Sequence, residues 1–395
     1  MRRTAGVVVI GGGVVGTSTA FHLATSGAKD IMLLERRFLG AGATGKSGAV
    51  VRMHYTNQHD AALAQESLPY FQRWDDVVGA GDPGFVRTGV VRFVAPEHDP
   101  QLRANVTMLR DVGVNTELIT PDDVRELDPG CRVDDITCAA YEPDSGYADP
   151  SATAFGFAAR ARQLGVAVQT GIEATAIVTD KDRVVGVETT DGAIATDTVV
   201  LANGAWAPPL LARLGLDFGL RPNRVQVVIF RRPEDAPQTH LTILDGHEGM
   251  WLRPEGRAGT LAGLGIDQFG VDPSAYDETV DPDYVEQVRR CLVHRRPAMV
   301  DAPMRGGWAG VITMSPDTHA IIDHIPAYRG LYCALGDSGT NFKTAPAIGK
   351  CLAEWIVDGS PRTVDLRPFR SSRFADQELL VGAHEYGDEP MNVFR

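Results

Sequence analysis

Three glycines near the start of the chain have the spacing of a turn that binds a pyrophosphate. Gly11, Gly13 and Gly16 form a G-x-G-x-x-G pattern between an apolar run at 7–10 and a helical pattern. The glycines permit a tight turn, and the following helix presents unpaired N–H groups. Glu35 ends the next apolar run, where an acid accepts hydrogen bonds from ribose. Alone the glycines indicate a tight turn, but this placement predicts a dinucleotide site at Gly11, Gly13, Val14, Val15, Gly16 and Glu35.

A second glycine-rich loop follows at once and favours a ligand longer than NAD. Residues 36–49 read RRFLGAGATGKSGA. An NAD-binding domain does not need such a loop at this point, whereas a ligand that extends beyond its pyrophosphate has to be enclosed there. The expected contacts from this loop are Arg36, Ala43, Thr44, Lys46, Ser47 and Gly48.

A motif near the other end of the chain combines a glycine turn with a cation. Residues 331–349 read LYCALGDSGTNFKTAPAIG, a strand that leads into a Gly/Ser turn and then a helix. We expect Pro346 near the first helical position and Gly359 just past the helix end. Lys343, just upstream, would add to the positive potential of the helix N-terminus. Without its flanking pattern, Lys343 would be an ordinary exposed lysine.

Together these segments resemble the D-amino acid oxidase superfamily, in its sarcosine oxidase, glycine oxidase and dimethylglycine dehydrogenase branch. The likeness runs over roughly residues 6–375 and includes the segment TMSPD at 313–317. It implies FAD as the cofactor, with the strand that ends near 201 and its small-residue turn as a second contact. The further contacts that the resemblance implies are Ala174, Ala202, Gly204, Trp206, Gly336, Ser338, Gly339, Thr340, Asn341, Phe342 and Lys343.

The resemblance implies oxidation of the C–N bond of a small amino acid or of a secondary or N-methyl amine. Hydride transfer to the flavin would give an imine that hydrolyses. Arg52 and Lys343 fall at the family's positions for gripping a substrate carboxylate, and His54 is a third candidate catalytic residue. Alcohol oxidation needs a general base such as His54, whereas a neutral amine already has its lone pair. A 2-hydroxy acid dehydrogenase of the same superfamily and a nucleotide-binding protein without redox turnover are the alternatives.

Departures from the family concern FAD attachment and the electron acceptor. Monomeric sarcosine oxidases tether FAD through a cysteine where this chain has Gly310, and dimethylglycine dehydrogenases use a histidine where it has Lys46. We therefore expect FAD to be held without a covalent bond. The lysine that promotes reaction with dioxygen in monomeric sarcosine oxidases falls near Gly263, so the acceptor, dioxygen or another molecule, stays open.

The predicted fold class is α/β, a Rossmann-type FAD-binding domain joined to an α+β domain built on a mostly antiparallel sheet. We assign 1–85, 145–220 and 319–375 to the FAD-binding domain, 86–144 and 221–318 to the substrate domain, and 376–395 to a C-terminal tail. Strands at 226–230, 250–253 and 261–264 would roof the substrate cavity. Asp191-Gly192 predicts a hairpin between strands at 184–189 and 194–201.

Composition excludes several classes of partner. The formal net charge of −13, without a basic block, disfavours nucleic acid. No apolar run is long enough for a membrane span. Five cysteines without metal-ligand spacing indicate reduced thiols in a cytoplasmic protein. No metal site is expected, although His319, Asp323 and His324 lie close together in sequence. The oligomeric state cannot be read from the sequence.

Overall fold

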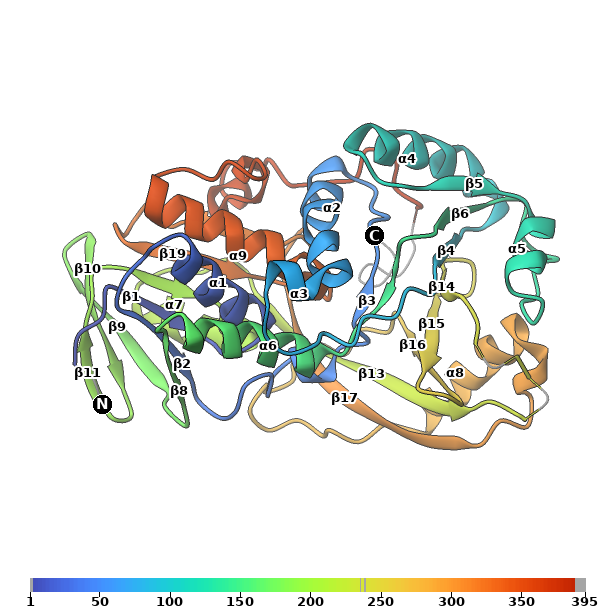
Figure 1. Cartoon of the computed structure of the whole chain (residues 1–395), viewed down its shortest axis with the longest axis horizontal. Helices are drawn as coiled ribbons and strands as arrows, with labels where there is room; N and C mark the ends of the chain where they lie inside the picture. Colours follow the sequence, from blue (N-terminus) through green and yellow to red (C-terminus); the bar gives the residue numbers. More distant parts are fainter. Residues whose placement is uncertain (1–2, 235, 238, 388–395) are drawn as a thin grey trace.

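The computed structural model describes residues 3–234, 236–237 and 239–387. It contains two large sheets, one at each end of the longest axis, with helices packed on both (Figure 1). One sheet is mainly parallel and the other mainly antiparallel. This arrangement confirms the predicted α/β fold class.

The mainly parallel sheet carries the strand that precedes the glycine turn. Its strands are parallel except at one edge, where β18 is antiparallel to β19. Apolar residues fill both faces because helices cover one face and a small sheet with a helix covers the other. In spatial order the strands are β18 (Ile321–His324), β19 (Leu331–Leu335), β12 (Val199–Leu201), β1 (Val7–Ile10), β2 (Ile31–Glu35) and β8 (Ala167–Thr170).

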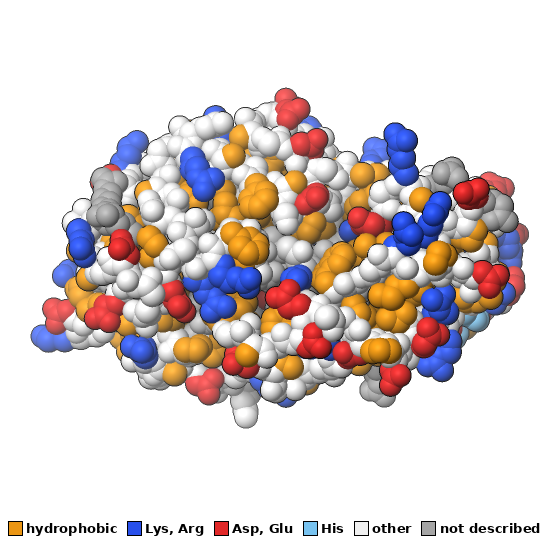
Figure 2. All heavy atoms as spheres, turned by 90° about the horizontal axis from the view of Figure 1, so that it is seen from below, with side chains coloured by type: hydrophobic (Ala, Val, Ile, Leu, Met, Phe, Trp, Pro, Cys, Tyr) orange, Lys and Arg blue, Asp and Glu red, His pale blue; other side chains and the backbone are white. Residues whose placement is uncertain are grey.

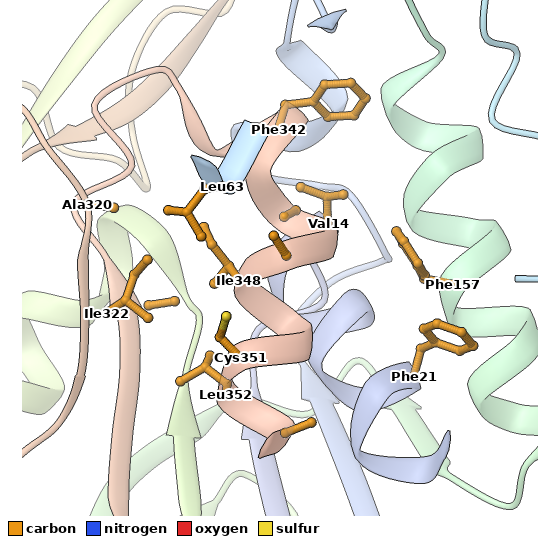
Figure 3. Close-up of a cluster of buried hydrophobic side chains, with 14 of the residues drawn as sticks. Val14, Phe21, Leu63, Phe157, Ala320, Ile322, Phe342, Ile348, Cys351 and Leu352 are labelled. Atoms are coloured by element: carbon orange, nitrogen blue, oxygen red, sulfur yellow. The ribbon is translucent and has the colours of Figure 1, made fainter. Parts of the chain in front are cut away.

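Alternation along β1 distributes its side chains between two cores. Val7 and Val9 face the helices α1, α6 and α9, whereas Val8 and Ile10 face α7 and the three-stranded sheet. Figure 3 shows the helical side, where Ile348 on α9 lies near Leu63 and Val14. The three-stranded sheet has the order β11 (Gly192–Ala195), β10 (Arg183–Thr189) and β9 (Ala174–Asp180).

The eight-stranded sheet is antiparallel at every pairing except that of β14 with β4. One face packs on α8 and α5. The strands are β17 (Met304–Met314), β13 (Arg221–Arg231), β16 (Gly259–Leu264), β15 (Met250–Glu255), β14 (Thr242–Asp245), β4 (Val90–Phe93), β6 (Ala139–Glu142) and β5 (Glu117–Ile119); β3 (Val50–Val51) and β7 (Gly146–Tyr147) form a separate pair.

Helices connect and cover these sheets. The α-helices are α1 (Val14–Thr25), α2 (Gln58–Gln72), α3 (Trp74–Val77), α4 (Asp99–Val112), α5 (Pro121–Leu127), α6 (Pro150–Gln163), α7 (Ala207–Arg213), α8 (Pro282–Arg295) and α9 (Asn341–Asp358). The short 3-10 helices are η1 (Thr44–Lys46), η2 (Pro96–His98), η3 (Gly204–Trp206), η4 (Pro297–Met299), η5 (Arg367–Phe369) and η6 (Ser371–Phe374).

Two sequence-based expectations about elements were wrong. The run at 194–201 is two strands, because the chain turns at Thr196, whose hydroxyl bonds to the backbone of Thr198, and passes from the three-stranded sheet into the parallel sheet. Helix α9 begins at Asn341 rather than near Pro346, so the proline lies inside it. Lys343 is therefore in the first turn of α9, not upstream. The hairpin at 183–195 and the cap at Gly359 are confirmed.

The two predicted domains supply the strands of the two large sheets separately. Segments 86–144 and 221–318 hold all eight strands of the antiparallel sheet, and the parallel strands come from the other segments. The exact domain boundaries stay a prediction.

The core between α1 and α6 gives a test of packing. Phe157 on α6 is fully buried, with its ring centroid 5.4 Å from that of Phe21 and 4.7 Å from that of Trp74. We expect Phe157→Ala to lower the free energy of unfolding by about 3–5 kcal/mol in urea titrations, because it leaves a cavity. Phe155→Ala, on the same helix but 48% exposed, should change it by less than about 0.5 kcal/mol. Equal losses in both variants would contradict this packing.

Candidate active site

A cavity of about 590 Å³ lies between the two large sheets. Its lining includes the turn after β1, the second glycine-rich loop, the start of α9, and residues of β13, β15 and β17. Val227, Leu244 and Trp251 face it from the side of the eight-stranded sheet that is opposite α8. The antiparallel sheet thus covers the cavity, as expected from the sequence.

The glycine turn packs closely against the neighbouring backbone, where Gly11 and Gly16 have no space for a side chain. A Cβ on Gly11, whose φ is +115°, would lie 2.3 Å from the Ala202 carbonyl oxygen, and one on Gly16 would lie 1.9 Å from the Gly11 oxygen. Helix α1 starts after Gly13 without a side-chain cap. Its N-terminus lines the cavity, where helix N–H groups can bind a phosphate.

Glu35 stands at the end of β2, beside this turn. Its carboxylate accepts hydrogen bonds from the Gly12 N–H at 2.8 Å and the Arg37 N–H at 2.7 Å. Each oxygen has a further lone pair, so the carboxylate can also accept from ribose hydroxyls.

The second glycine-rich loop closes over the start of α1. Thr44 Oγ1 accepts a hydrogen bond from the Val14 N–H at 3.0 Å. Lys46 Nζ forms an ion pair with Glu278 Oε2 at 2.6 Å, and the Lys46 carbonyl accepts from Trp308 Nε1 at 2.8 Å. A Cβ on Gly310 would lie 2.6 Å from Lys46 Cβ. Lys46 and Gly310, the two positions considered above for a covalent FAD attachment, therefore lie side by side.

Most of the predicted site residues meet at this cavity, although they come from five separate parts of the sequence. Those that line it are Gly11, Gly13, Val14, Val15, Glu35, Arg36, Ala43, Thr44, Lys46, Ser47, Gly48, Arg52, Ala174, Ala202, Gly204, Trp206, Gly336, Gly339, Asn341, Phe342 and Lys343. Their individual roles stay predictions.

Four predicted residues lie behind the lining. Gly16 packs α1 against the turn. The Ser338 hydroxyl accepts from the Ser315 N–H at 3.2 Å, and the Thr340 carbonyl accepts from Lys343 Nζ at 3.2 Å. His54 is buried beyond Arg52. These residues shape the site from behind through local packing and hydrogen bonds.

Arg52 and Lys343 form a buried cationic end of the cavity. The Arg52 guanidinium carbon lies 4.6 Å from the centroid of the Tyr55 ring, and Lys343 Nζ lies 5.3 Å from the same centroid. The guanidinium also donates to the His54 carbonyl oxygen. Both cations are nearly inaccessible from outside. Two basic side chains thus lie at one end of the cavity, where the carboxylates of Asp60 and Glu142 act on both of them.

Charged groups of both signs surround this end of the cavity. Burial and then the charge of Arg52 lower the pKa of Lys343 well below its ordinary value. Burial raises the pKa of Glu142, which accepts from the Met53 N–H and the Ser145 hydroxyl. A bound anion would offset the repulsion between the two cations.

His54 is a neutral, structurally engaged side chain. Burial, followed by the charges of Arg92 and Arg52, lowers its pKa well below the ordinary value. Its Nε2 lies 2.7 Å from the Tyr386 hydroxyl. The placement puts His54 behind Arg52 rather than at the cavity wall, so it does not favour the predicted role as a catalytic base.

Several lining residues were missed by the sequence analysis. Asp337 lies within the terminal motif, so its position was an available signal. Burial raises its pKa to about 6, although the Gly339 and Thr313 N–H groups favour the charged form. Trp251 and Gln226 offered no such signal, because only the fold of the antiparallel sheet directs them to the cavity. A Cβ on Gly263 would lie 2.8 Å from Trp251 Nε1, so Trp251 fills the space beside that glycine.

Potential metal ligands gather at one place outside the cavity. Asp135, His247 and Glu248 offer ligand atoms within 4.8 Å of one another. The Asp135 carboxylate is already paired with Arg295 at 2.9 Å. The His319–Asp323–His324 stretch is dispersed: His319 Nδ1 bonds to Asp60 at 2.7 Å, and Asp323 accepts from Ser371. The absence of a metal stays a prediction.

The surface and the thiols agree with the composition. Acidic and basic side chains are interspersed on the face drawn in Figure 2, unlike the single-sign surface that binds a polyanion. All five cysteines are free. Among the described residues, no helix is long and apolar enough to cross a membrane. The cytoplasmic location stays a prediction.

The site fits FAD by its shape and its donors. The glycine turn and the N-terminus of α1 suit a pyrophosphate, and Glu35 suits a ribose. Asn203 lines the cavity, and its side-chain oxygen is buried without a partner in the part of the chain that the structure describes. The cavity continues beyond this nucleotide end to Lys343, which leaves space for the flavin and a substrate.

Comparisons with known proteins agree with this geometry. The chain is 28% identical over 388 residues to mitochondrial dimethylglycine dehydrogenase of Rattus norvegicus, covering 93% of this chain and 45% of that protein. It therefore spans about half the length of that relative. It is 24% identical to sarcosine oxidase subunit beta of Arthrobacter sp, covering 96% and 93% of the two chains.

A solved structure is similar over nearly the whole chain. The crystal structure of L-proline dehydrogenase from P. horikoshii matches with a TM-score of 0.89 and 26% identity, covering 96% of this chain and 100% of that one. The family model described as FAD dependent oxidoreductase (DAO) matches residues 6–355, which contain both glycine-rich segments and Lys343. The chain therefore belongs to the DAO family of FAD-dependent oxidoreductases.

Proposed function

We propose that the protein oxidises the C–N bond of a small amino acid or N-alkylated amino acid with FAD as its cofactor. The observation that carries this proposal is the pair of buried cations, Arg52 and Lys343, at the end of the cofactor cavity. A carboxylate is the anion that a small amino acid would bring to them. The similar proteins are named for dimethylglycine, sarcosine and L-proline, which all combine a carboxylate with an N-alkylated amine.

Each part of the site has its own task in this reaction. The turn at Gly11–Val15 and Glu35 would hold the pyrophosphate and ribose of FAD, which when bound supplies an acceptor for two electrons and a proton. Arg52 would bind the carboxylate through its planar fork, and Lys343 would contribute a compact charge beside it. Fixing the carboxylate orients the α-carbon, and such orientation lowers the barrier.

Protonation of Lys343 would accompany substrate binding. Burial and Arg52 depress its pKa, against the opposite effects of Asp60 and Glu142, so the amine loses its proton more easily than that of an exposed lysine. A carboxylate raises that pKa and draws a proton onto Nζ. Binding is then strongest at a pH low enough to protonate the amine, and it weakens as the pH rises.

The placement of His54 supports an amine rather than a 2-hydroxy acid. An alcohol must lose its hydroxyl proton to a base, whereas a neutral amine needs no such group. His54 is buried behind Arg52, with its Nε2 bonded to Tyr386. The electron acceptor, dioxygen or another molecule, and the oligomeric state remain open parts of the proposal.

Anaerobic reduction of the bound flavin tests the proposed reaction. We expect glycine, proline or an N-methyl amino acid to bleach the flavin absorbance in a stopped-flow instrument. The same amines without a carboxylate should do so at least about tenfold less efficiently, because one charge-assisted contact is lost. Bleaching by 2-hydroxy acids alone would contradict the proposal.

Substitution of the two cations tests their role in binding the carboxylate. Arg52→Ala should retain FAD but lose on the order of 2–5 kcal/mol in kcat/KM, the cost of removing one partner of a desolvated charge pair. Lys343→Met should also abolish the weakening of substrate binding with rising pH. Arg231→Ala, at an exposed arginine that pairs with Glu234, serves as the control. Wild-type efficiency in both cation variants would exclude this carboxylate site.

Acid precipitation tests the proposal of non-covalent FAD. Gly310 has no side chain, and the Lys46 amine is paired with Glu278 at 2.6 Å. The yellow colour should therefore remain in the supernatant after trichloroacetic acid treatment. Flavin that stays with the pellet would show an attachment residue elsewhere in the chain.

A further inference from the structure

The tail continues past the family match and folds back onto the site. Figure 1 shows it leaving the far side of α9 and running past α2 towards α4. The Leu380 N–H donates to Asp317 at 3.0 Å, and the Ala383 N–H donates to the Thr56 carbonyl at 2.8 Å. A Cβ on Gly382 would lie 2.3 Å from Thr56 Oγ1. The tail therefore lies directly against the segment 52–56.

Tyr386 is the deepest described anchor of this tail. The residue is 3% exposed and packs in a small core with Val94 and with residues of α4 and β6. The Arg92 guanidinium lies 4.8 Å from the centroid of its ring. Its hydroxyl lies 2.7 Å from His54 Nε2, and the two rings are close to parallel at 19°.

His54 connects this anchor to the cavity. Its backbone carbonyl accepts a hydrogen bond from the Arg52 guanidinium, which lines the cavity. Its Nδ1 is buried without a partner among the described residues. The Tyr386 hydroxyl is thus the hydrogen-bond partner that fixes the His54 imidazole. A fixed imidazole in turn holds the His54 backbone carbonyl, which accepts the hydrogen bond from Arg52.

We propose that Tyr386 is a positioning residue, which sets the orientation of Arg52 through His54 and thereby the affinity for the substrate carboxylate. The proposal rests on the proposed function for its substrate and on the contacts above for its geometry. Removal of the hydroxyl leaves a buried, neutral imidazole unpaired at both nitrogens, which is costly enough for the segment to rearrange. The tail, outside the part matched by the family, becomes part of the substrate site.

The variant Tyr386→Phe removes the hydroxyl and keeps the ring that packs on Arg92. We expect KM for a carboxylate-bearing amine to rise about tenfold, with kcat within about twofold and FAD binding unchanged. The matched control is Tyr328→Phe, which removes a hydroxyl bonded to the Leu214 carbonyl at 2.7 Å on the other large sheet. In an Arg52→Ala background Tyr386→Phe should have no further effect, because the two residues act along one path.

Hydrogen–deuterium exchange of residues 50–57 gives a readout that does not depend on turnover. The FAD-loaded Tyr386→Phe protein should exchange faster there, and Tyr328→Phe should match the wild type. Unchanged exchange with unchanged KM would overturn the proposal, as would an equal rise in KM for an amine without a carboxylate. If no carboxylate-bearing amine reduces the wild-type flavin, the proposed function fails, and the exchange result alone still decides whether Tyr386 positions this segment.

Discussion

Two buried cations at one end of a cavity impose the main constraint on this site. Removing Arg52 and Lys343 from water is costly unless each charge is compensated. The carbonyl groups of His54 and Thr340 accept their hydrogen bonds, and the ring of Tyr55 lies against both. The carboxylates of Asp60 and Glu142 also act on both cations, yet burial still lowers the pKa of Lys343. This balance underlies the proposal that a carboxylate binds at this end of the cavity.

Packing between two helices fixes Lys343 relative to the nucleotide turn. Lys343 lies in the first turn of α9, and the turn at Gly11–Val15 leads into α1. The helices approach closely because Gly349 has no side chain: a Cβ there would lie 2.4 Å from Ser18 Oγ. The Ser18 hydroxyl also donates a hydrogen bond to the Ala345 carbonyl at 2.9 Å. A ligand held by the turn is therefore presented to the cation with little freedom to shift.

The antiparallel sheet completes the cavity by another close approach. Trp251 lies over Gly48 and Gly263, and a Cβ on either glycine would come within 3 Å of its ring. The Lys46–Glu278 ion pair and the Trp308–Lys46 hydrogen bond join the second glycine-rich loop to the part of the molecule that holds the antiparallel sheet. The cofactor cavity thus depends on contacts between both large sheets, which explains why its residues are spread over most of the chain.

Local patterns in the sequence determined the nucleotide turn, the role of Glu35 at a strand end, the second loop and the terminal motif. Each of these features needs particular residues close together in the sequence, so a short segment is enough to identify it. The limits of α8 were also set locally, by a proline at its start and a hydrophobic period. Pro346 was expected near the start of α9 but lies inside it, because the packing of α9 on α1 stabilises a helix that includes a proline.

Only the tertiary structure decided which residues stand behind the first layer of the site. The polar residues Thr196-Asp197-Thr198 interrupt the run at 194–201, but only the fold shows that its two parts belong to different sheets. The sequence suggested His54 as a base beside Arg52, but its Nε2 is hydrogen-bonded to the hydroxyl of Tyr386, 332 positions later. Trp251 and Gln226 reach the site only through strand pairing. Such contacts join distant segments, and residue spacing carries no information about them.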